Sequence, residues 1–554
     1  MAEPLSAHEF APSGHVDTFC ADNLPPRELW PVRDWTGVPE LDYPVRLNCA
    51  AELLDGAVER GDGDRAALFS PAERWTYREL LERANRIAHV LVEDLGVVPG
   101  NRVLLRGPNT PMLAACWFGV LKAGGVVVCT MPLLREREIR YVADKAEVTL
   151  ALSDTRFVDE CEQGLATRDT GGRRQGARTV HFGTDAPGSL EALMRDKPAT
   201  FDACDTAAED TAIIAFTSGT TGQGKGTMHS HRDILAITDC FPKYVLEPSR
   251  DDVFCGSPPL AFTYALGGLL LFPLRIGASA LLVEQGPPPH LLKAITEHRP
   301  TVCFTAPTGY RAMHGMLGEH DVSSLRLCVS AGETLPVSVF EMWREATGLK
   351  IIDGIGATEM LHIFISSSGD DIRPGATGKV VPGYSAKIVG DDGRDAPAGA
   401  VGRLAVRGPT GCRYLGNRER QTEYVRDGWN FTGDSYKVDE DGYFWYQART
   451  DDMIISSGYN LSGPEVENVL LEHAAVKECA VIGVPDEARG QLVKAVIVLR
   501  AGFEGCPALV KEMQDFVKAR IAPYKYPRAV EFVDALPRTA TGKLQRYRLR
   551  ETAS

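Results

Sequence analysis

The sequence predicts an α/β protein with a large N-terminal domain of mostly parallel sheets flanked by helices, a β-barrel-like section, and a small α+β C-terminal domain. Up to residue 384, short runs of Val, Leu and Ile alternate with windows of helical spacing, which is typical of βαβ units whose sheets are buried on both faces. After that point, short strands joined by Gly/Asp turns replace the alternation. The length of 554 residues allows three to four folding units of roughly 150 residues each.

The parallel part is predicted from apolar runs of strand length. Residues 102–106 form the first clear run, helical spacing follows over residues 111–123, and a second run covers residues 125–130. Because a parallel strand must return through a crossover, runs separated by helical windows indicate parallel pairing. Runs of the same kind return at residues 149–153, 211–216, 279–283, 301–304 and 325–329.

The antiparallel section and the C-terminal domain have a different pattern. Residues 385–389, 402–407 and 443–447 are short strands with Gly/Asp turns between them, as in a barrel. A polar junction at Arg449–Asp452 follows, so we place one domain at residues 1–449 and the other at residues 450–554. In the second domain we expect helices at residues 465–473 and 509–520 and strands at residues 476–484 and 493–499.

The composition argues against several classes of function. Lys and Arg number 60 against 74 Asp and Glu, a net charge of −14, so nucleic acids and anionic membranes would repel the protein. The thirteen cysteines form no C-x-x-C pair, which indicates free thiols in a reducing compartment. The N-terminus lacks the basic and apolar segments of a signal peptide, and Pro273 and Arg275 interrupt the most apolar stretch. We therefore expect a cytoplasmic protein that does not span a membrane.

The sharpest local motif is the Thr/Ser/Gly-rich segment Thr217–Gly226. It follows the apolar run of residues 212–216 and precedes a predicted helix that begins at His231. Small residues let a loop backbone wrap phosphate oxygens, hydroxyl groups donate hydrogen bonds, and a lysine supplies positive charge. The candidate phosphate-binding residues are Thr217, Ser218, Gly219, Thr220, Thr221, Gly222 and Lys225.

A P-loop ATPase is an alternative interpretation of the same segment. The spacing from Gly219 to Lys225 matches Gly-x-x-x-x-Gly-Lys, the start of a Walker A loop. Gly226 stands where that loop needs Ser or Thr to hold magnesium, and no Walker B carboxylate follows in a βαβ context. Both observations count against this alternative.

Five further motifs follow the phosphate loop, and together the six resemble the adenylate-forming superfamily. This superfamily includes acyl-CoA synthetases, luciferases and peptide-synthetase adenylation domains, and the resemblance covers nearly the whole chain. The five motifs resemble an adenine-side loop, a Thr-Glu motif, a ribose motif, a hinge with its following loop, and a C-terminal lysine motif; they are Ser330–Pro336, Asp353–Glu359, Gly428–Asp434, Arg449–Gly458 and Leu536–Lys543.

The resemblance implies that a carboxylate is joined to the α-phosphate of ATP. It places Lys225 on the outer phosphates, Thr358 near the α-phosphate, Glu359 on magnesium and Asp434 on the ribose hydroxyls. Lys543 would bridge the attacking carboxylate and the α-phosphate, which is chemically reasonable because negative charge builds up there. The remaining implied nucleotide contacts are Gly332, Glu333, Thr334, Asp353, Gly354, Ile355, Gly356 and Arg449.

The same resemblance implies that the small C-terminal domain is mobile. It would rotate about a hinge at Asp451 after adenylation and complete a tunnel for CoA that Ser457, Gly458 and Tyr459 line. The departures from the family pattern, none of which removes a charged group, are Gly224 for Pro, Ile355 for a stacking Tyr and Ser457 for Gly.

Two segments resemble those of benzoate and 2-aminobenzoate CoA ligases. They are residues 360–366, directly after the Thr-Glu motif, and residues 15–28 near the N-terminus. By that likeness Tyr264 would wall a flat aromatic slot, and His362 would lie at its rim or near the carboxylate. The candidate acyl-pocket residues are Phe262, Tyr264, Ala265, Gly356, His362 and Ile363.

We therefore expect an ATP- and Mg²⁺-dependent ligase that converts benzoate, 2-aminobenzoate or 2-hydroxybenzoate to its CoA thioester through an acyl-AMP. CoA is the expected acceptor because no carrier domain is fused to the chain. A free-standing enzyme that loads the pantetheine of a carrier protein is the alternative. The expected partners are thus a small aromatic acid and CoA, and a homodimer is an assembly that the sequence allows. The sequence does not identify the ring substituent, because one hydrogen-bonding side chain can decide it.

Overall fold

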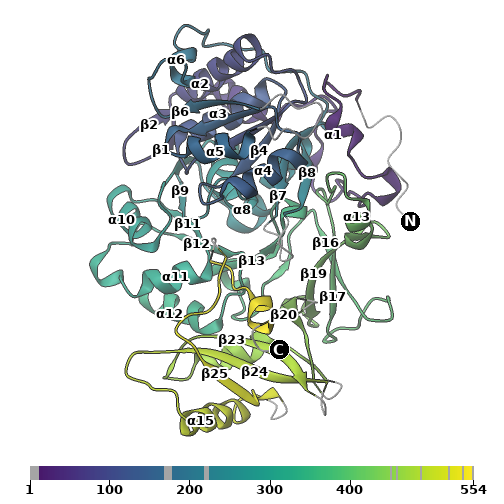
Figure 1. The fold of residues 1–554 in the computed structure, drawn as a ribbon, viewed down its shortest axis with the longest axis vertical. Helices are drawn as coiled ribbons and strands as arrows, with labels where there is room; N and C mark the ends of the chain where they lie inside the picture. The colour runs from purple at the N-terminus through teal and green to yellow at the C-terminus, as the bar shows by residue number, and fades with distance from the viewer. Residues whose placement is uncertain are drawn as a thin grey trace.

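The computed structural model describes residues 11–166, 177–217, 224–449, 452–456, 459–486, 490–521, 525–539 and 542–551. Within these ranges the strands form four sheets. Figure 1 shows a large N-terminal part and, at one end of the molecule, a small C-terminal part coloured light green to yellow. The expected α/β architecture is confirmed.

The two largest sheets are mostly parallel, as the alternating apolar runs predict. Their strand orders are β6-β5-β3-β4-β7-β8 and β15-β14-β13-β12-β11-β9-β10-β1-β2, and antiparallel pairs occur only toward their edges among the described strands. The first sheet contains β3 (Arg102–Arg106), β4 (Val126–Thr130), β5 (Leu150–Asp154), β6 (Arg178–Phe182), β7 (Thr211–Phe216) and β8 (Gly226–Ser230). The second contains β1 (Ala66–Phe69), β2 (Arg74–Thr76), β9 (Val253–Gly256), β10 (Ser279–Leu281), β11 (Val302–Thr305), β12 (Leu327–Ala331), β13 (Ile351–Gly356), β14 (Ile363–Ser366) and β15 (Lys379–Val380).

Helices α2 (Tyr77–His89) and α3 (Pro111–Lys122) lie between these two sheets. Thr76 caps α2 in a capping box with Glu79, and Thr110 caps α3, which is buried nearly all round. The side chains of β3 alternate between two cores: Val103 packs against α2 and α3, whereas Leu104 packs against the outer helices. The sheet is therefore covered on both faces.

The outer faces of both sheets are covered by further helices. The six-stranded sheet carries α4 (Glu136–Lys145) and α5 (Val158–Leu165), and the nine-stranded sheet carries α10 (Pro288–His298), α11 (Pro307–His314) and α12 (Val337–Thr347). The remaining helices of the N-terminal part are α1 (Phe19–Asp22), α6 (Leu190–Met194), α7 (His231–Asp239), α8 (Thr263–Leu266), α9 (Phe272–Arg275) and α13 (Arg418–Tyr424).

The predicted antiparallel section is also present. Its strand order is β16-β17-β19-β18, and β20 pairs with β19. The strands are β16 (Ser385–Val389), β17 (Gly402–Arg407), β18 (Val425–Arg426), β19 (Trp429–Val438) and β20 (Phe444–Arg449). Strand β20 of this sheet bridges to Gly378, just before β15 of the nine-stranded sheet. The motifs expected to bind the nucleotide lie at the ends of β12 and β13 in that nine-stranded sheet.

The C-terminal part is a five-stranded sheet with helices on both faces. Helices α14 (Gly463–Leu471) and α15 (Pro507–Lys518) cover one face and α16 (Arg546–Glu551) covers the other, because Val481 and Ile482 of the long strand β23 point to opposite sides. Its strands are β21 (Ile454–Ser456), β22 (Tyr459–Leu461), β23 (Val476–Asp486), β24 (Gly490–Leu499) and β25 (Ala529–Phe532). Among the helices that the structure describes, none has both the length and the apolar character required to cross a bilayer.

Candidate active site

The two ends of the predicted phosphate loop are held together. The Thr217 amide donates to the Lys225 carbonyl at 2.9 Å, and the Lys225 amide donates to Oγ1 of Thr217 at 3.2 Å. A Cβ on Gly224 would come within 2.7 Å of the Thr217 carbonyl oxygen, so glycine permits this close approach. The loop leads from β7 into the antiparallel strand β8, whereas a Walker A loop leads into a helix. This arrangement argues against the P-loop alternative.

The Thr-Glu motif forms a short 3₁₀ turn, η11 (Thr358–Met360), beyond the end of β13. The carboxylate of Glu359 accepts a hydrogen bond from the Tyr414 hydroxyl at 2.6 Å. Nε2 of His229, on β8, lies 2.7 Å from the carbonyl oxygen of Thr358. The main chain at Tyr414 also bridges to Thr227. Strand β8, which follows the phosphate loop, is therefore linked to the Thr-Glu motif twice: directly through His229, and through Tyr414, whose main chain bridges to Thr227.

The ribose motif lies on β19, directly opposite the end of β20. Asp434 pairs with Arg449 in the strand register, and Nη1 of Arg449 donates to Oδ1 of Asp434 at 3.3 Å. Burial raises the pKa of Asp434, and the Arg449 guanidinium acts against it. The pKa of Arg449 is raised, chiefly by Asp434. This pair presents a carboxylate and a cation at the same edge of the antiparallel sheet.

The C-terminal lysine reaches this site from the other domain. A Cβ placed on Gly332, which has φ +87°, would lie 3.8 Å from Cε of Lys543. The Lys543 residue as a whole is exposed to solvent. Its pKa is nevertheless lowered, first because protein atoms surround the ammonium and second because Arg449 repels it. The carboxylates of Glu333, Asp434 and Glu359 act in the opposite direction. Residues from four other predicted motifs therefore lie near the lysine of the C-terminal domain.

The predicted adenine side surrounds the ends of β12 and β13. Asp353 lies opposite Ser330 in the register of these strands, and burial raises the pKa of its carboxyl group to about 8. Gly332 and Thr334 are exposed, and Glu333 is half-buried. Ile355 packs against the main core, and Gly354 leaves room for Ile363 on β14.

The predicted acyl-pocket residues lie together around Tyr264 and His362. The Tyr264 hydroxyl donates to the Val329 carbonyl at 3.1 Å. The ring centroids of Tyr264 and His362 lie 5.8 Å apart. Nε2 of His362 lies 3.2 Å from the Tyr264 carbonyl oxygen, and burial lowers the pKa of this histidine to about 3. Ala265 and Ile363 are fully buried beside them, Phe262 is half-buried, and Gly356 is exposed, with its Cβ position against the His362 backbone. His362 is thus a neutral residue of an aromatic cluster.

Several predicted site residues lie outside the described residues, or their side chains do. They are Ser218, Gly219, Thr220, Thr221 and Gly222 of the phosphate loop, the hinge residue Asp451, and Ser457 and Gly458; for Tyr459 only the backbone, in β22, is described.

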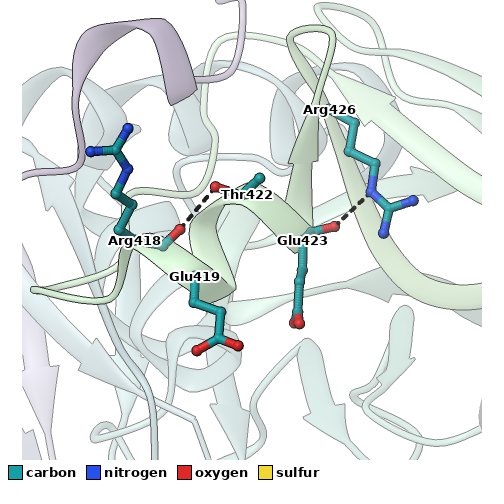
Figure 2. A pocket seen from close by; sticks show the side chains of 5 residues that line it. All are labelled: Arg418, Glu419, Thr422, Glu423 and Arg426. Carbon is teal, nitrogen blue, oxygen red and sulfur yellow. Dashed lines mark hydrogen bonds between the residues drawn. The ribbon is translucent and has the colours of Figure 1, made fainter.

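A separate hollow lies along α13, and Figure 2 shows the side chains that line it: Arg418, Glu419, Thr422, Glu423 and Arg426. All five are exposed, and their bonds are local, such as Thr422 Oγ1 donating to the Arg418 carbonyl at 3.0 Å. None of the groups expected to carry chemistry lines this hollow. We therefore assign the site to the cluster around Lys543.

The sequence did not single out three residues that support this cluster. Tyr414 and His229 hold the Thr-Glu motif, and Arg538 contacts Glu333 across the domains. Arg538 lay inside the C-terminal lysine motif, where its charge was a usable signal. Tyr414 and His229 stood in segments without a recognised motif.

Comparisons with known proteins agree with this geometry. Residues 55–414 match the model of the AMP-binding enzyme family, and residues 465–543 match the AMP-binding enzyme C-terminal domain. The benzoate–CoA ligase of Thauera aromatica is 35% identical over 520 residues, which cover 92% of this chain and 97% of that protein.

Solved structures give the same picture. The anthranilate CoA ligase AuaEII in complex with anthranoyl-AMP is 36% identical, with a TM-score of 0.87 over 93% of this chain and 99% of that one. A benzoate CoA ligase from Burkholderia xenovorans LB400 is 34% identical, with a TM-score of 0.82 over 91% and 100%. The similarity thus spans both domains and the motifs that meet at Lys543, and the chain belongs to the AMP-binding enzyme family of the adenylate-forming superfamily.

Proposed function

We propose that this enzyme is an aryl-CoA ligase that activates a benzoate-type acid with ATP and transfers the aryl group to CoA, releasing AMP and pyrophosphate. The observation that carries the proposal is the position of Lys543 beside Gly332, with Glu333, Glu359 and Asp434 nearby. The similarity to benzoate and anthranilate CoA ligases over more than nine-tenths of the chain supports the substrate class.

In the first step, a carboxylate oxygen of the acid attacks the α-phosphorus of ATP. The new bond joins that oxygen to phosphorus, and the bond between the α-phosphorus and the bridging oxygen breaks as pyrophosphate leaves. Lys543 neutralises the charge that builds up on the phosphoryl oxygens, as a positioned cation does in such transition states. Asp434 accepts hydrogen bonds from the ribose hydroxyls, and Arg449 orients Asp434.

Glu359 is the residue that we assign to magnesium. Mg²⁺ prefers oxygen ligands and binds through one or two carboxylates together with substrate phosphates. The Tyr414 hydroxyl donates to Oε1 of Glu359 at 2.6 Å and so orients this carboxylate. When bound, the ion supplies positive charge to the phosphates. Lys225, at the base of the phosphate loop, adds a second cation for the outer phosphates.

The aryl ring is assigned to the region of Tyr264 and His362. Tyr264 is fixed by its hydroxyl, so its ring can form a rigid wall, and Phe262, Ala265, Ile363 and Gly356 complete the proposed surround. Small-molecule sites are apolar with few polar groups, as this cluster is. A benzoate, 2-aminobenzoate or 2-hydroxybenzoate is the class of acid that we propose.

In the second step, the sulfur of the CoA thiol attacks the acyl carbon of the aryl-AMP, and the thioester bond forms as the thiol proton is released to solvent. AMP leaves with the electrons of the broken acyl–oxygen bond. We assign Ser457, Gly458 and Tyr459 to the pantetheine tunnel and Asp451 to the hinge. The corresponding domains are residues 1–449 for adenylation and residues 450–554 for the mobile lid. We also propose a cytoplasmic location. We propose a homodimer as the assembly, which light scattering would test.

The test is acid-dependent pyrophosphate release with ATP and Mg²⁺, with and without CoA. Benzoate, 2-aminobenzoate, 2-hydroxybenzoate and a medium-chain fatty acid form the panel, and mass spectrometry identifies the product. We expect aryl-dependent release, acceleration by CoA and an aryl-CoA. Release without any CoA thioester would point to a carrier-protein acceptor, and ADP in place of AMP would refute the proposal.

A further inference from the structure

Lys543 ends a short hairpin whose other side begins at Arg538. Arg538 bridges to Leu544, the Thr539 amide donates to the Lys543 carbonyl at 2.8 Å, and the Lys543 amide donates to Oγ1 of Thr539 at 3.0 Å. Gly542 turns the chain with φ +87°. The hairpin fixes the backbone of Lys543, but the four-carbon side chain retains its rotamer freedom unless other groups restrain it.

The Arg538 guanidinium ties this hairpin to two other elements. Nη1 donates to the Gly542 carbonyl at 2.7 Å inside the turn, and Nη2 donates to Oε2 of Glu478, on β23, at 2.8 Å. Nη1 also lies 3.8 Å from Oε1 of Glu333, which belongs to the loop after β12 in the large domain. A guanidinium offers five donors in a rigid fork, so one side chain can serve these three partners together.

Glu333 lies near both Arg538 and Lys543. Its side chain is 17% exposed. Burial raises the pKa of its carboxyl group, and Arg538, Thr308 and Lys543 act in the opposite direction. The neighbouring residue, Gly332, is the one whose Cβ position lies 3.8 Å from Cε of Lys543. One carboxylate of the large domain is therefore near two cations of the lysine hairpin.

We infer that Arg538 is a positioning residue for Lys543. Its ion pair with Glu333 and its bond inside the turn hold the lysine hairpin against the Gly332–Glu333 loop, so that the ammonium is at the α-phosphate during adenylation. The inference rests on the proposed function, because it assigns Arg538 to the step in which Lys543 acts. The contacts of Arg538 with Gly542, Glu478 and Glu333 assign it this positioning role, so its effect on the rate would pass through Lys543.

The experiment is a double-mutant cycle measured on aryl-AMP formation. It compares the wild-type full chain with R538A, K543A and the double variant, and follows acid-dependent pyrophosphate release together with thermal unfolding. A misplacement of about 1 Å can cost roughly 100-fold in rate, so we expect R538A to lower kcat by about 10- to 100-fold with less change in the KM for the acid. In the K543A background the same substitution should change the rate less than about twofold, because its route of action is already absent.

Two further variants separate positioning from a general loss of structure. R538K retains one charge without the fork, so it should recover part of the rate that R538A loses. R520A is the matched control, since Arg520 forms a surface ion pair with Glu472 at 3.4 Å in the same domain and lies outside the hairpin; its kcat should equal that of the wild type.

The inference would be overturned by either of two results. One is an R538A enzyme with wild-type kcat, and the other is an R538A effect of equal size with and without Lys543. If R538A unfolds below the assay temperature, an R538K enzyme that folds and has wild-type kcat overturns it as well. A wild-type protein without acid-dependent pyrophosphate release would instead refute the proposed function itself, which the first measurement of the series reveals.

Discussion

The hydroxyl group of Tyr414 can be removed with little change to the shape of the core. It donates to Glu359 at 2.6 Å, and the residue is 1% exposed with its ring 5.7 Å from that of Tyr424. Tyr414→Phe therefore deletes one hydrogen bond to a charged group and leaves the ring packing in place. Since we assign Glu359 to magnesium, the substitution tests how that carboxylate is held.

We expect Tyr414→Phe to bind magnesium more weakly and to keep most of its kcat once magnesium is saturating. A hydrogen bond to a charged group contributes about 1.5–3 kcal/mol, and roughly 1.4 kcal/mol corresponds to a factor of ten. Loss of a side chain that orients a metal ligand typically costs about 10- to 100-fold in metal affinity. At fixed ATP, we expect the Mg²⁺ concentration for half-maximal pyrophosphate release to rise about 10-fold or more, with a smaller change in kcat at saturation.

Tyr424→Phe is the matched control for this measurement. The Tyr424 hydroxyl is buried and has no hydrogen-bond partner among the residues that the structure describes. Its removal should leave the Mg²⁺ requirement unchanged and the melting temperature equal or slightly higher, because an unsatisfied buried group is lost. A Mg²⁺ titration of Tyr414→Phe that coincides with that of the wild type would refute the assignment of Tyr414 as the support of this carboxylate.

Three other substitutions test the remaining parts of the site. Lys543→Ala should lower kcat for pyrophosphate release by about 100-fold or more, as loss of a charge-stabilising group does, and an active variant would count against its role. Asp434→Asn should raise the KM for ATP by roughly 10-fold through weaker ribose binding, measured by ATP titration. Burial raises the pKa of Asp353 to about 8, so between pH 4 and 8 the unfolded chain loses a proton that the folded chain keeps, and stability falls as pH rises. Asp353→Asn should flatten that slope, which is at most about 1.4 kcal/mol per pH unit, in urea unfolding from pH 5 to 8; an unchanged slope would contradict the burial.

Several strands that are buried on both faces could be located from sequence, although the internal strands β1, β9 and β13 were not predicted, and the edge strands β6 and β2 were not predicted either. The run at residues 125–130 became β4, and the run at residues 102–106 became β3, because three consecutive apolar side chains stand at the centre of each. Strand β6 lies at a sheet edge and includes an exposed arginine and a half-buried histidine, so it shows no continuous run. Strand β2 is only three residues long. An edge strand meets solvent, and its sequence therefore resembles that of a loop.

The site divides in a similar way. Asp434, Glu359 and Lys543 could be proposed because each stands in a short motif that is contiguous in the sequence. Tyr414 is 55 positions from Glu359, and that pairing depends on how the segment before α13 lies against β8. Arg538 meets Glu333 only because the two domains are in contact. Local patterns do not contain such long-range choices, so the supporting residues required a structure.

The balance of charge around Lys543 links nucleotide binding to catalysis. Without a ligand, Lys225 and Lys543 have lowered pKa values, because protein atoms surround them and because each lies near an arginine, Arg420 for the first and Arg449 for the second. A polyphosphate placed between two lysines adds negative charge, which favours their charged forms and raises both pKa values. On our assignment of Lys543 to the α-phosphate, a bound nucleotide would therefore favour the charged form of this lysine. By the same linkage, the charged lysine would strengthen binding of the nucleotide, so that on the proposed assignment ATP binding and the protonation of Lys543 are coupled.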